Sequence, residues 1–478
     1  MRRYGLAVAA LAVAIGVFLW EGGARRSATA PFTPAPQPAA RPSNVLLLSI
    51  DTLRAEHLSL YGYRRETSPH LEAFARGAMT YDNAYTTATF TSPSVVSLLT
   101  GTLPAAHGVR FLFQKLPPDT WTLPRYLHAH GWWTGAVISN FVLTASASGL
   151  APQFDEYDDT VAEQEVGHRK RVVQRLAEDT TAAAVAWLRR NRARPFFLWV
   201  HYIDPHGPYA APAPFDRRFR GSPPERVKEA KIPAYQRLAH ITDLGYYVDQ
   251  YDGEVAYTDE HLGRLLATVN GLGLLADTFV VVTADHGESL TERHGGKAVF
   301  LDHGHHVWEE LARIPLVVYR PGGAVGRTDA LVSLADIVPT VLDALEVPRP
   351  DVALDGAPLD ATVRPDVVIE AAQKPLRAVR RGPWKLVATV DTKSEKAVRS
   401  ASLIDLRAGG REWVGPALDG NGPAADLVAQ LTHYLARDRQ DLDALKWEAE
   451  IARMKARAPR DPHVKADLER LRALGYVQ

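Results

Sequence analysis

The chain of 478 residues contains no cysteine. This absence excludes disulfide bonds, thiolate metal sites and a lipid-modified anchor cysteine, although it does not by itself fix the compartment. The chain also lacks an excess of charge of either sign, since lysines plus arginines and aspartates plus glutamates both number 55. No overall field therefore favours nucleic acid or an acidic partner. The hydrophobic share of 46% suffices for one large α/β unit and a smaller one.

The N-terminus resembles a segment for export. Arg2-Arg3 precede an apolar run over residues 6–20, and small residues follow at 28–30. This order matches the charged, apolar and cleavage regions of a secretory signal. The run is shorter than the roughly 20 apolar residues of a comfortable membrane span, and Pro31 is a poor first residue for a cleaved product. We expect a periplasmic or extracellular protein, with residues 1–30 either removed as a signal peptide or kept as a membrane anchor.

Five apolar runs predict the strands of a buried sheet. The first, at 45–50, ends at Asp51 and is typical of a strand covered on both faces. Helical patterns separate the runs, as at 177–190 and 260–269. This alternation predicts an α/β fold with a doubly wound, mostly parallel sheet flanked by helices. The other four runs are 136–138, 196–200, 279–282 and 315–319.

The pattern changes in the last quarter of the chain. Short β-like segments between 366 and 426 predict a smaller C-terminal subdomain with an antiparallel sheet. Residues 427–478 are charged and helical, and we expect one face of this tail to pack on the body. A stretch rich in proline and alanine at 31–43 reads as a stiff linker. These boundaries leave residues 44–365 as the main domain.

Polar side chains follow three of the predicted strands. Asp51, the stretch His201–His206 and the pair Asp285-His286 each stand just after an apolar run. An aspartate after a strand is more often a turn former or a helix cap. In a doubly wound sheet, however, ligands bind beyond the carboxyl ends of the strands. Three such strand ends together predict a site at one edge of the sheet.

The stretch 91–101 carries the most specific motif, Thr-Ser-Pro-Ser-Val-Val-Ser-Leu-Leu-Thr-Gly. It resembles the active-site signature of the sulfatase family, in which Cys-x-Pro-Ser-Arg precedes a short helix that ends in Leu-Leu-Thr-Gly. In that family the cysteine is oxidised to formylglycine, the nucleophile. Further blocks resemble the sulfatase-like branch of the alkaline phosphatase superfamily in the same order, at 44–54, 204–209, 251–254, 285–288 and 303–305.

The resemblance implies a divalent metal ion held by Asp51, Thr91, Asp285 and His286. Two carboxylates and an imidazole neutralise such an ion and leave a position for an alkoxide. Coordination to a metal is one way to activate a threonine hydroxyl. A helix predicted over 92–99 puts Thr91 at its N-terminus, which favours a bound oxyanion. The ion is expected to be zinc, manganese, magnesium or calcium, and the histidine favours zinc or manganese.

Three histidines and an asparagine complete the predicted site. The resemblance implies that His206 and one of the later histidines contact substrate oxygens or act as the general acid. We assign His206 and His305 to catalysis with Thr91, and His206, Asn140 and His303 to substrate binding. Together with Asp204, the histidines at 206, 303 and 305 are also candidates to hold a second metal ion.

The chain departs from sulfatases at four places. Thr91 replaces the cysteine, Val95 the arginine that steadies formylglycine, and Thr52 the second of two metal-binding aspartates. Ser139-Asn140 falls where the family carries a sulfate-binding lysine and histidine. Threonine has one hydroxyl, so a sulfated threonine would have no internal exit. A phosphorylated threonine can be attacked in line by water or an alcohol.

We therefore predict an exported, metal-dependent hydrolase or phosphotransferase that cleaves phosphodiesters or phosphomonoesters through a covalent Thr91 intermediate. Its substrate would be a small-molecule or envelope ester, with no nucleic-acid partner, and residues 44–365 would be the catalytic domain. One alternative is a sulfatase that cleaves sulfate esters by direct water attack without formylglycine. Another is a catalytically silent binding protein of the same fold. Retention of the metal residues argues against silence, because a dead site has no need for two buried carboxylates.

Overall fold

The computed structural model describes most of the chain after the N-terminal segment. The described residues are 30–38, 41–166, 169–238, 240–294, 297–360, 364–391, 397–408, 412–416, 423–438 and 447–473. Residues 1–29, which carry the predicted export signal, lie outside them. In the part of the chain that is described, no helix is both long enough and apolar enough to cross a membrane.

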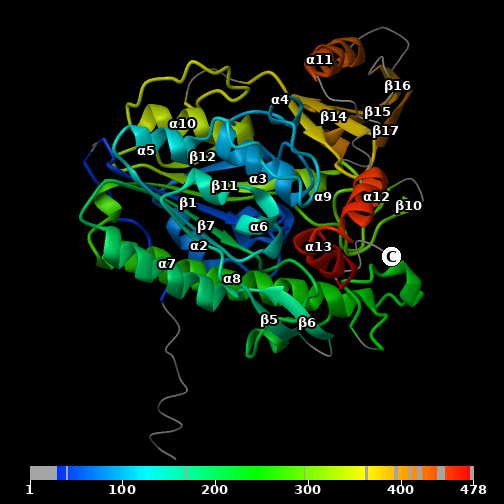
Figure 1. The fold of residues 1–478 in the computed structure, drawn as a ribbon, viewed down its shortest axis with the longest axis horizontal. Helices are drawn as coiled ribbons and strands as arrows, with labels where there is room; N and C mark the ends of the chain where they lie inside the picture. Colours follow the sequence, from blue (N-terminus) through cyan, green and yellow to red (C-terminus); the bar gives the residue numbers. More distant parts are fainter. Residues whose placement is uncertain are drawn as a thin grey trace, which may run out of the picture.

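The main sheet has eight strands, seven of which run in one direction (Figure 1). They are β1 (Asn44–Ile50), β2 (Met79–Tyr85), β3 (Trp133–Ile138), β4 (Glu156–Asp158), β7 (Phe196–Tyr202), β8 (Thr278–Ala284), β11 (Arg313–Tyr319) and β12 (Gly326–Ser333). Their order across the sheet is β12-β2-β11-β8-β1-β7-β3-β4. Only β11 is antiparallel, to both of its neighbours. The predicted mostly parallel sheet is therefore confirmed.

The centre of this sheet is buried on both faces. Every residue of β1, β7 and β8 is buried, as expected for strands covered by helices on each side. In the register, Ser49 of β1 stands between His201 of β7 and Thr283 of β8. The residues just beyond these strands therefore meet at one edge of the sheet.

Helices cover the two faces of the sheet (Figure 1). On one side lie α2 (Pro69–Ala75), α7 (Ala177–Asn191) and α8 (Leu244–Gly271), and on the other lie α3 (Thr91–Thr100), α5 (Leu123–Ala129) and α10 (Ile337–Ala344). Helix α8 begins well before the predicted 260–269. Its first half buries polar side chains, including Asp252 and Glu254, and these interrupt the apolar period that marks an amphipathic helix.

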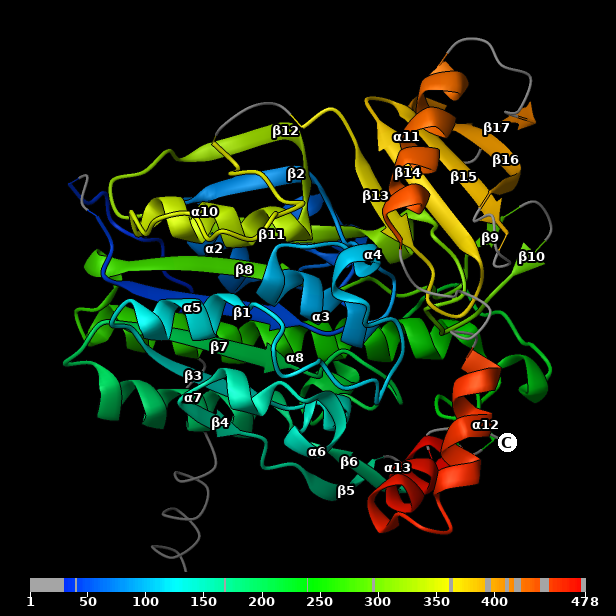
Figure 2. The same ribbon diagram turned by 45° about the horizontal axis from the view of Figure 1, so that its top comes forward.

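A second sheet follows the main one and is wholly antiparallel (Figure 2). Its strands are β13 (Val367–Glu370), β14 (Leu376–Arg381), β15 (Trp384–Val390), β16 (Val398–Asp405) and β17 (Glu412–Pro416). Helix α11 (Pro423–Arg437) packs on this sheet through Leu427 and Leu431. A separate C-terminal antiparallel sheet was predicted, and the structure confirms it.

The remaining elements are short or lie at the end of the chain. Helices α12 (Trp447–Arg457) and α13 (Pro462–Ala473) lie against the main unit, where Ile451 and Leu471 join its hydrophobic core. Shorter elements are α4 (Pro104–His107), α6 (Ala145–Ser148), α9 (Glu309–Ala312), β5 (Ala162–Val166), β6 (Arg169–Gln174), β9 (Arg293–His294) and β10 (Lys297–Ala298). The pair β5–β6 forms a hairpin.

Candidate active site

Two fully buried carboxylates lie side by side at the carboxyl edge of the main sheet. Asp51 follows β1, and Asp285 follows the neighbouring strand β8. Nε2 of His201 lies 3.5 Å from Asp51 Oδ2. Nε2 of His286 lies 3.8 Å from Asp51 Oδ1 and 3.6 Å from Asp285 Oδ2. Across the described residues, histidines pair with these two carboxylates but lysines and arginines do not.

Three atoms of this cluster are buried without a hydrogen-bond partner among the described residues. They are Asp51 Oδ1, Asp285 Oδ2 and His201 Nε2. Ligand atoms of the same three residues lie within 4.8 Å of one another. Buried polar atoms in folded proteins nearly always have a partner, and one cation would serve all three. Two carboxylates and an imidazole fit a divalent transition ion, so this cluster can hold a metal ion.

The charges of the two carboxylates are coupled. Burial alone would raise the pKa of Asp51, but His201, His206 and His286 outweigh burial and hold that pKa below its usual value. Burial, followed by the negative charge of Asp51, raises the pKa of Asp285 well above its usual value. Without a cation, burial and the charge of Asp51 therefore favour the protonated form of Asp285. A divalent cation removes this conflict and favours the ionised form of both.

A strained residue joins the two carboxylates. Thr52 follows Asp51 and has φ of 53°, a left-handed conformation that is rare for a β-branched residue. In this conformation its backbone N–H donates to Asp285 Oδ1 at 3.3 Å. The Tyr251 hydroxyl donates to the Thr52 carbonyl at 2.8 Å and fixes the turn. The strain therefore orients the Asp285 carboxylate.

Thr91 places its hydroxyl beside this cluster. It is the first residue of α3, a helix whose ten residues are all buried, and α3 confirms the helix predicted over 92–99. Thr91 Oγ1 lies 3.2 Å from His286 Nε2, while His286 Nδ1 lies 2.9 Å from the Gly287 carbonyl. Since a carbonyl only accepts, Nδ1 carries the proton of the neutral ring. Nε2 then holds a lone pair that faces the Thr91 hydroxyl.

Asn140 contacts the carboxylate cluster directly. Its Nδ2 donates to Asp51 Oδ2 at 2.5 Å, and its Oδ1 accepts the Val142 N–H at 3.0 Å. It also borders a narrow cavity of about 10 Å³ that reaches Thr91. This cavity is lined by Thr91, Leu112, Asn140, Phe141, Val142, Val172, Val173, Gln174, Ile203, His206 and Gly207. The lining of this cavity is apolar apart from a few uncharged polar groups and one histidine.

Two of the predicted histidines lie together behind His286. The ring centroid of His303 is 4.6 Å from that of His286 and 5.2 Å from that of His206. His303 Nδ1 lies 3.2 Å from Glu288 Oε1, and Tyr209 donates to Glu288 Oε2 at 2.8 Å. Burial raises the pKa of Glu288 to about 8. Burial, then His286 and His206, lowers the pKa of His303 well below its usual value.

The described part of the structure does not bring together the residues that were predicted as candidates to hold a second metal ion. His305 is partly exposed, and its Nε2 pairs with Asp302 Oδ2 at 3.1 Å. Asp204 Oδ2 accepts the Ala177 N–H at 2.8 Å, and burial raises the pKa of Asp204 to about 7. Among the residues that the structure describes, the metal-binding group is the one at Asp51 and Asp285. Asp204, His206, His303 and His305 form no second group there.

Comparison with known proteins assigns the family. The Sulfatase family model matches residues 43–347, more than half of the chain. The chain belongs to the sulfatase family. It is 24% identical to the choline-sulfatase of Rhizobium meliloti, over 85% of this chain and 87% of that protein. It is 26% identical to the arylsulfatase K of Gallus gallus, over 67% of this chain and 66% of that protein.

Solved structures share the fold of this sulfatase-family chain. The phosphonate monoester hydrolase of Agrobacterium radiobacter superposes with a TM-score of 0.65 at 20% identity. The superposition covers 83% of this chain and 95% of that one. Hydrolases of sulfate esters and of phosphonate esters thus occur among the proteins to which this chain is similar. The predicted resemblance to the sulfatase-like branch is confirmed.

His201 is the site residue whose role the sequence did not predict. Its position after a strand led us to expect it at this edge, and it does converge there with Asp51 and Asp285. The sequence assigned the imidazole ligand to His286 instead. A match to a local motif contains no information about how distant strands pair. The parallel register of β7 and β1 places His201 beside Ser49 and close to Asp51. The sequence feature that could have indicated this role is a histidine near the end of a fully buried strand.

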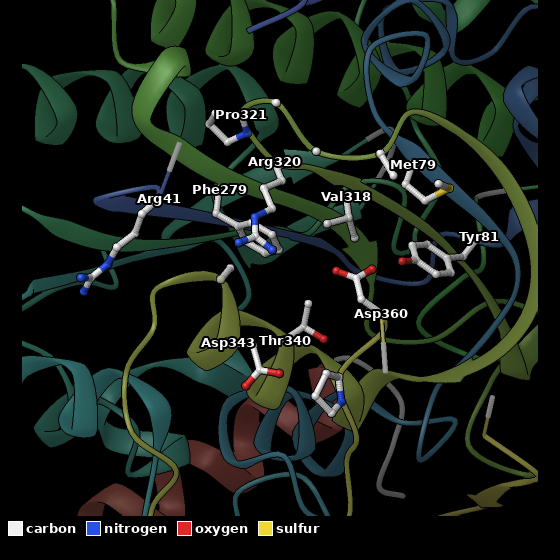
Figure 3. A pocket seen from close by; sticks show the side chains of 15 residues that line it. Arg41, Met79, Tyr81, Phe279, Val318, Arg320, Pro321, Thr340, Asp343 and Asp360 are labelled. Carbon is white, nitrogen blue, oxygen red and sulfur yellow. The ribbon is translucent and has the colours of Figure 1, made fainter. Parts of the chain in front are cut away.

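Another cavity lies at the opposite edge of the sheet, and Figure 3 shows the side chains that line it. It has a volume of about 650 Å³ and is lined near the start of β2 by Met79 and near the start of β8 by Phe279. Arg320, Asp343 and Asp360 add charges of both signs to its wall. Met79 and Phe279 stand at the amino ends of their strands, whereas Asp51 and Asp285 follow the carboxyl ends of β1 and β8. The cavity is therefore separate from the catalytic edge.

Proposed function

We propose that this sulfatase-family hydrolase is a metal-dependent phosphoesterase that forms a covalent phospho-Thr91 intermediate. The observation that carries the proposal is the position of the Thr91 hydroxyl, 3.2 Å from His286 Nε2 and beside the buried Asp51–Asp285 pair. Asp51, Asp285, His286 and Thr91 would hold the ion. When bound, that ion would lower the pKa of the hydroxyl and stabilise charge on the phosphoryl oxygens.

The first step is attack by Thr91 on phosphorus. Its Oγ forms a bond to phosphorus while the ester bond to the leaving oxygen breaks in line, and the hydroxyl proton would pass to water. The N-terminus of α3 favours the negative charge that gathers there. Neutral Thr91 is a weak nucleophile at its ordinary pKa, so its activation would depend on the bound cation.

The second step returns the enzyme to its starting state. Water or an alcohol attacks phosphorus on the side opposite Thr91 Oγ, the P–O bond to Thr91 breaks, and the hydroxyl regains a proton. His206 borders the Thr91 cavity. Its Nδ1–H donates to the Gly207 carbonyl at 2.8 Å, and this bond fixes the direction in which the other ring nitrogen, Nε2, points. His206 or His305 would protonate the leaving oxygen, with His303 and Asn140 near the substrate.

The residues around the small cavity beside Thr91 bring no positive charge to a leaving group. They include Leu112, Phe141 and Val142 but no lysine or arginine. An aryl or alkyl ester of phosphate is therefore a suitable probe, and the natural substrate would be a small-molecule or envelope phosphoester.

Thr91→Ala and Thr91→Ser test the chemistry against an aryl phosphodiester, an aryl phosphomonoester and an aryl sulfate. We expect a phosphoester to be the fastest substrate of the wild type. Thr91→Ala should lose on the order of 10³ or more in kcat/KM, whereas Thr91→Ser keeps the hydroxyl and retains substantial activity. Mass spectrometry of quenched wild type should find one phosphoryl group on the peptide that contains Thr91.

A sulfatase that needs no covalent intermediate gives the opposite result. Aryl sulfate would then be turned over faster than either phosphoester, and Thr91→Ala would keep that rate. The sulfatases among the relatives make this the second candidate function. A protein that binds these esters without turning over any of them would be the silent binding protein.

Export is part of the proposal. Residues 1–30 would direct the chain across the inner membrane as a cleaved signal or as an anchor. Fusion of a periplasm-dependent reporter after residue 43 should give activity that disappears when residues 1–30 are deleted. Activity of a cytoplasm-dependent reporter at the same junction would contradict export.

A further inference from the structure

His201 lies on β7, the neighbour of β1 on the side away from β8, and has no role in the predicted ligand set. It is fully buried on β7, next to Ser49 of β1 in the parallel register. Its Nδ1 lies 2.8 Å from Ser49 Oγ. Its Nε2 points toward Asp51, at 3.5 Å from Oδ2. One ring nitrogen is therefore held by a neighbouring side chain, and the other faces the carboxylates.

A hydrogen bond does not account for the position of this second nitrogen. The separation of 3.5 Å between His201 Nε2 and Asp51 Oδ2 is long for N–H···O, whereas Asn140 Nδ2 donates to the same oxygen at 2.5 Å. His201 Nε2 is one of three buried atoms that lack a partner here, with Asp51 Oδ1 and Asp285 Oδ2. These atoms come from residues on or just after three adjacent strands. A shared cation would satisfy all of them.

We infer that His201 is a ligand of the metal ion at Asp51 and Asp285, through Nε2, and that Ser49 fixes its ring. The inference rests on the metal centre of the proposed function and adds a residue to it. Ligation requires a proton on Nδ1 that is donated to Ser49 Oγ. Ser49 Oγ also accepts from Trp199 Nε1 at 2.8 Å. A hydroxyl oxygen has two lone pairs and can accept both bonds.

This arrangement matches the usual support of a metal-bound histidine. Such a ring donates its other N–H to an acceptor, which sets the tautomer and orients the ring. Ser49 and Trp199 provide that support from within the sheet, where the backbone is rigid. With His286, His201 would give the ion two imidazole nitrogens. That donor set favours zinc or manganese over calcium, which takes oxygen ligands.

His201→Asn tests the ligand role while keeping the contact with Ser49. The asparagine amide occupies the place of Nδ1 but has no atom at the position of Nε2. We expect the affinity of the chelator-treated protein for zinc and manganese, measured by calorimetric titration, to fall about 100-fold or more. Ser49→Ala, which removes only the support, should cost about tenfold. His201→Gln, whose amide reaches toward the Nε2 position, should recover part of the loss.

Two controls keep this result interpretable. His57 is another buried histidine beside a carboxylate, with Nδ1 at 2.6 Å from Asp252 Oδ1, and His57→Asn should leave metal affinity unchanged. Circular dichroism and thermal unfolding establish that each variant is folded. The visible spectrum of the cobalt-loaded protein gives a readout independent of activity, and it should change in His201→Asn but not in His57→Asn.

The outcomes separate this inference from the proposed function. If His201→Asn binds both ions within about threefold of wild type while Asp51→Ala binds neither, the metal centre exists and His201 is no ligand. His201 would then be a donor that orients Asp51. If wild type itself binds no divalent ion, the proposed function and this inference both fail.

Discussion

Two clusters of buried charge in this protein are built in different ways. At the edge of the main sheet, Asp51 and Asp285 are buried beside histidines. Next to the second sheet, Glu370 of β13 accepts from Arg110 Nε at 2.9 Å and Nη2 at 3.1 Å, and Arg377 Nε lies 3.1 Å from the same carboxylate. The second cluster contains its own cations, and the first does not.

The difference separates a structural cluster from a binding site. Arg110 also donates to Asp438 Oδ2 at 2.7 Å, so two arginines meet two carboxylates and the charges cancel within the fold. Burial alone would raise the pKa of Glu370, but Arg110 and Arg377 lower it to about 2. A buried charge without such compensation is costly. The carboxylates at the sheet edge therefore require a cation from outside the chain.

The largest expected effect comes from removing one of the carboxylates at the sheet edge. Asp51→Ala should release the metal ion and lower kcat/KM on the order of 10³ or more, because the ion and the activated hydroxyl are both lost. Elemental analysis and steady-state assays on the same preparation check this. A variant that keeps both its metal and its rate would remove Asp51 from the centre.

Breaking the self-neutralised cluster should affect stability instead. Glu370→Gln leaves Arg377 buried without the carboxylate it faces and leaves Arg110 with Asp438 alone, and we expect a loss of about 3–5 kcal/mol in the free energy of unfolding. Metal affinity should be unchanged in the folded variant. Asp343 and Arg349 form an exposed pair, so Asp343→Asn is the matched control and should cost within about 0.5 kcal/mol. Equal losses of unfolding free energy in Glu370→Gln and Asp343→Asn would contradict the structural role assigned to the buried cluster.

The same cluster predicts a pH dependence. Glu370 has a folded pKa of about 2 against an ordinary value of 4.5. Its stabilising contribution is therefore present above pH 4.5 and is lost as the pH falls toward 2. The difference corresponds to about 3 kcal/mol. Urea unfolding over this acidic range should show stability falling less steeply in Glu370→Gln than in wild type. Parallel slopes would contradict the assigned ion pair.

The smallest effect on stability is expected from replacing Asp51 when no metal ion is bound. In the presence of chelator, Asp51→Asn removes the ionised member of the carboxyl pair while its amide oxygen can still accept from Asn140. The variant should be as stable as chelated wild type within about 1 kcal/mol, in contrast to Glu370→Gln. A loss comparable to that of Glu370→Gln would mean that Asp51 serves the fold rather than an ion.

The sequence predicted the parts of this molecule that follow from local pattern. Continuous apolar runs such as 45–50 predicted the central strands, and the motif at Thr91 predicted a helix with Thr91 at its N-terminus. The polar first half of α8 and the strand β2 have no such pattern, since Asp252 and Asp82 interrupt their apolar periods.

The site was predictable to the extent that each residue follows a strand. Asp51 and Asp285 were expected at one edge, and they meet there. The position of His201 at the site depends on the register of β7 against β1 and on the hydrogen bond between its Nδ1 and Ser49 Oγ. These are contacts across 152 positions of sequence, which no local spacing encodes. The self-neutralised cluster around Glu370 is a long-range assembly of the same kind.

The most direct test of the central claim is a calorimetric titration of chelator-treated wild type with zinc and with manganese. The account predicts saturable binding of a single ion per chain at the Asp51–Asp285 site. Binding should release protons near neutral pH, because burial and Asp51 raise the pKa of Asp285 in the absence of a cation. Asp51→Ala should abolish that binding. Absence of binding by wild type, or binding that Asp51→Ala leaves intact, would contradict the account.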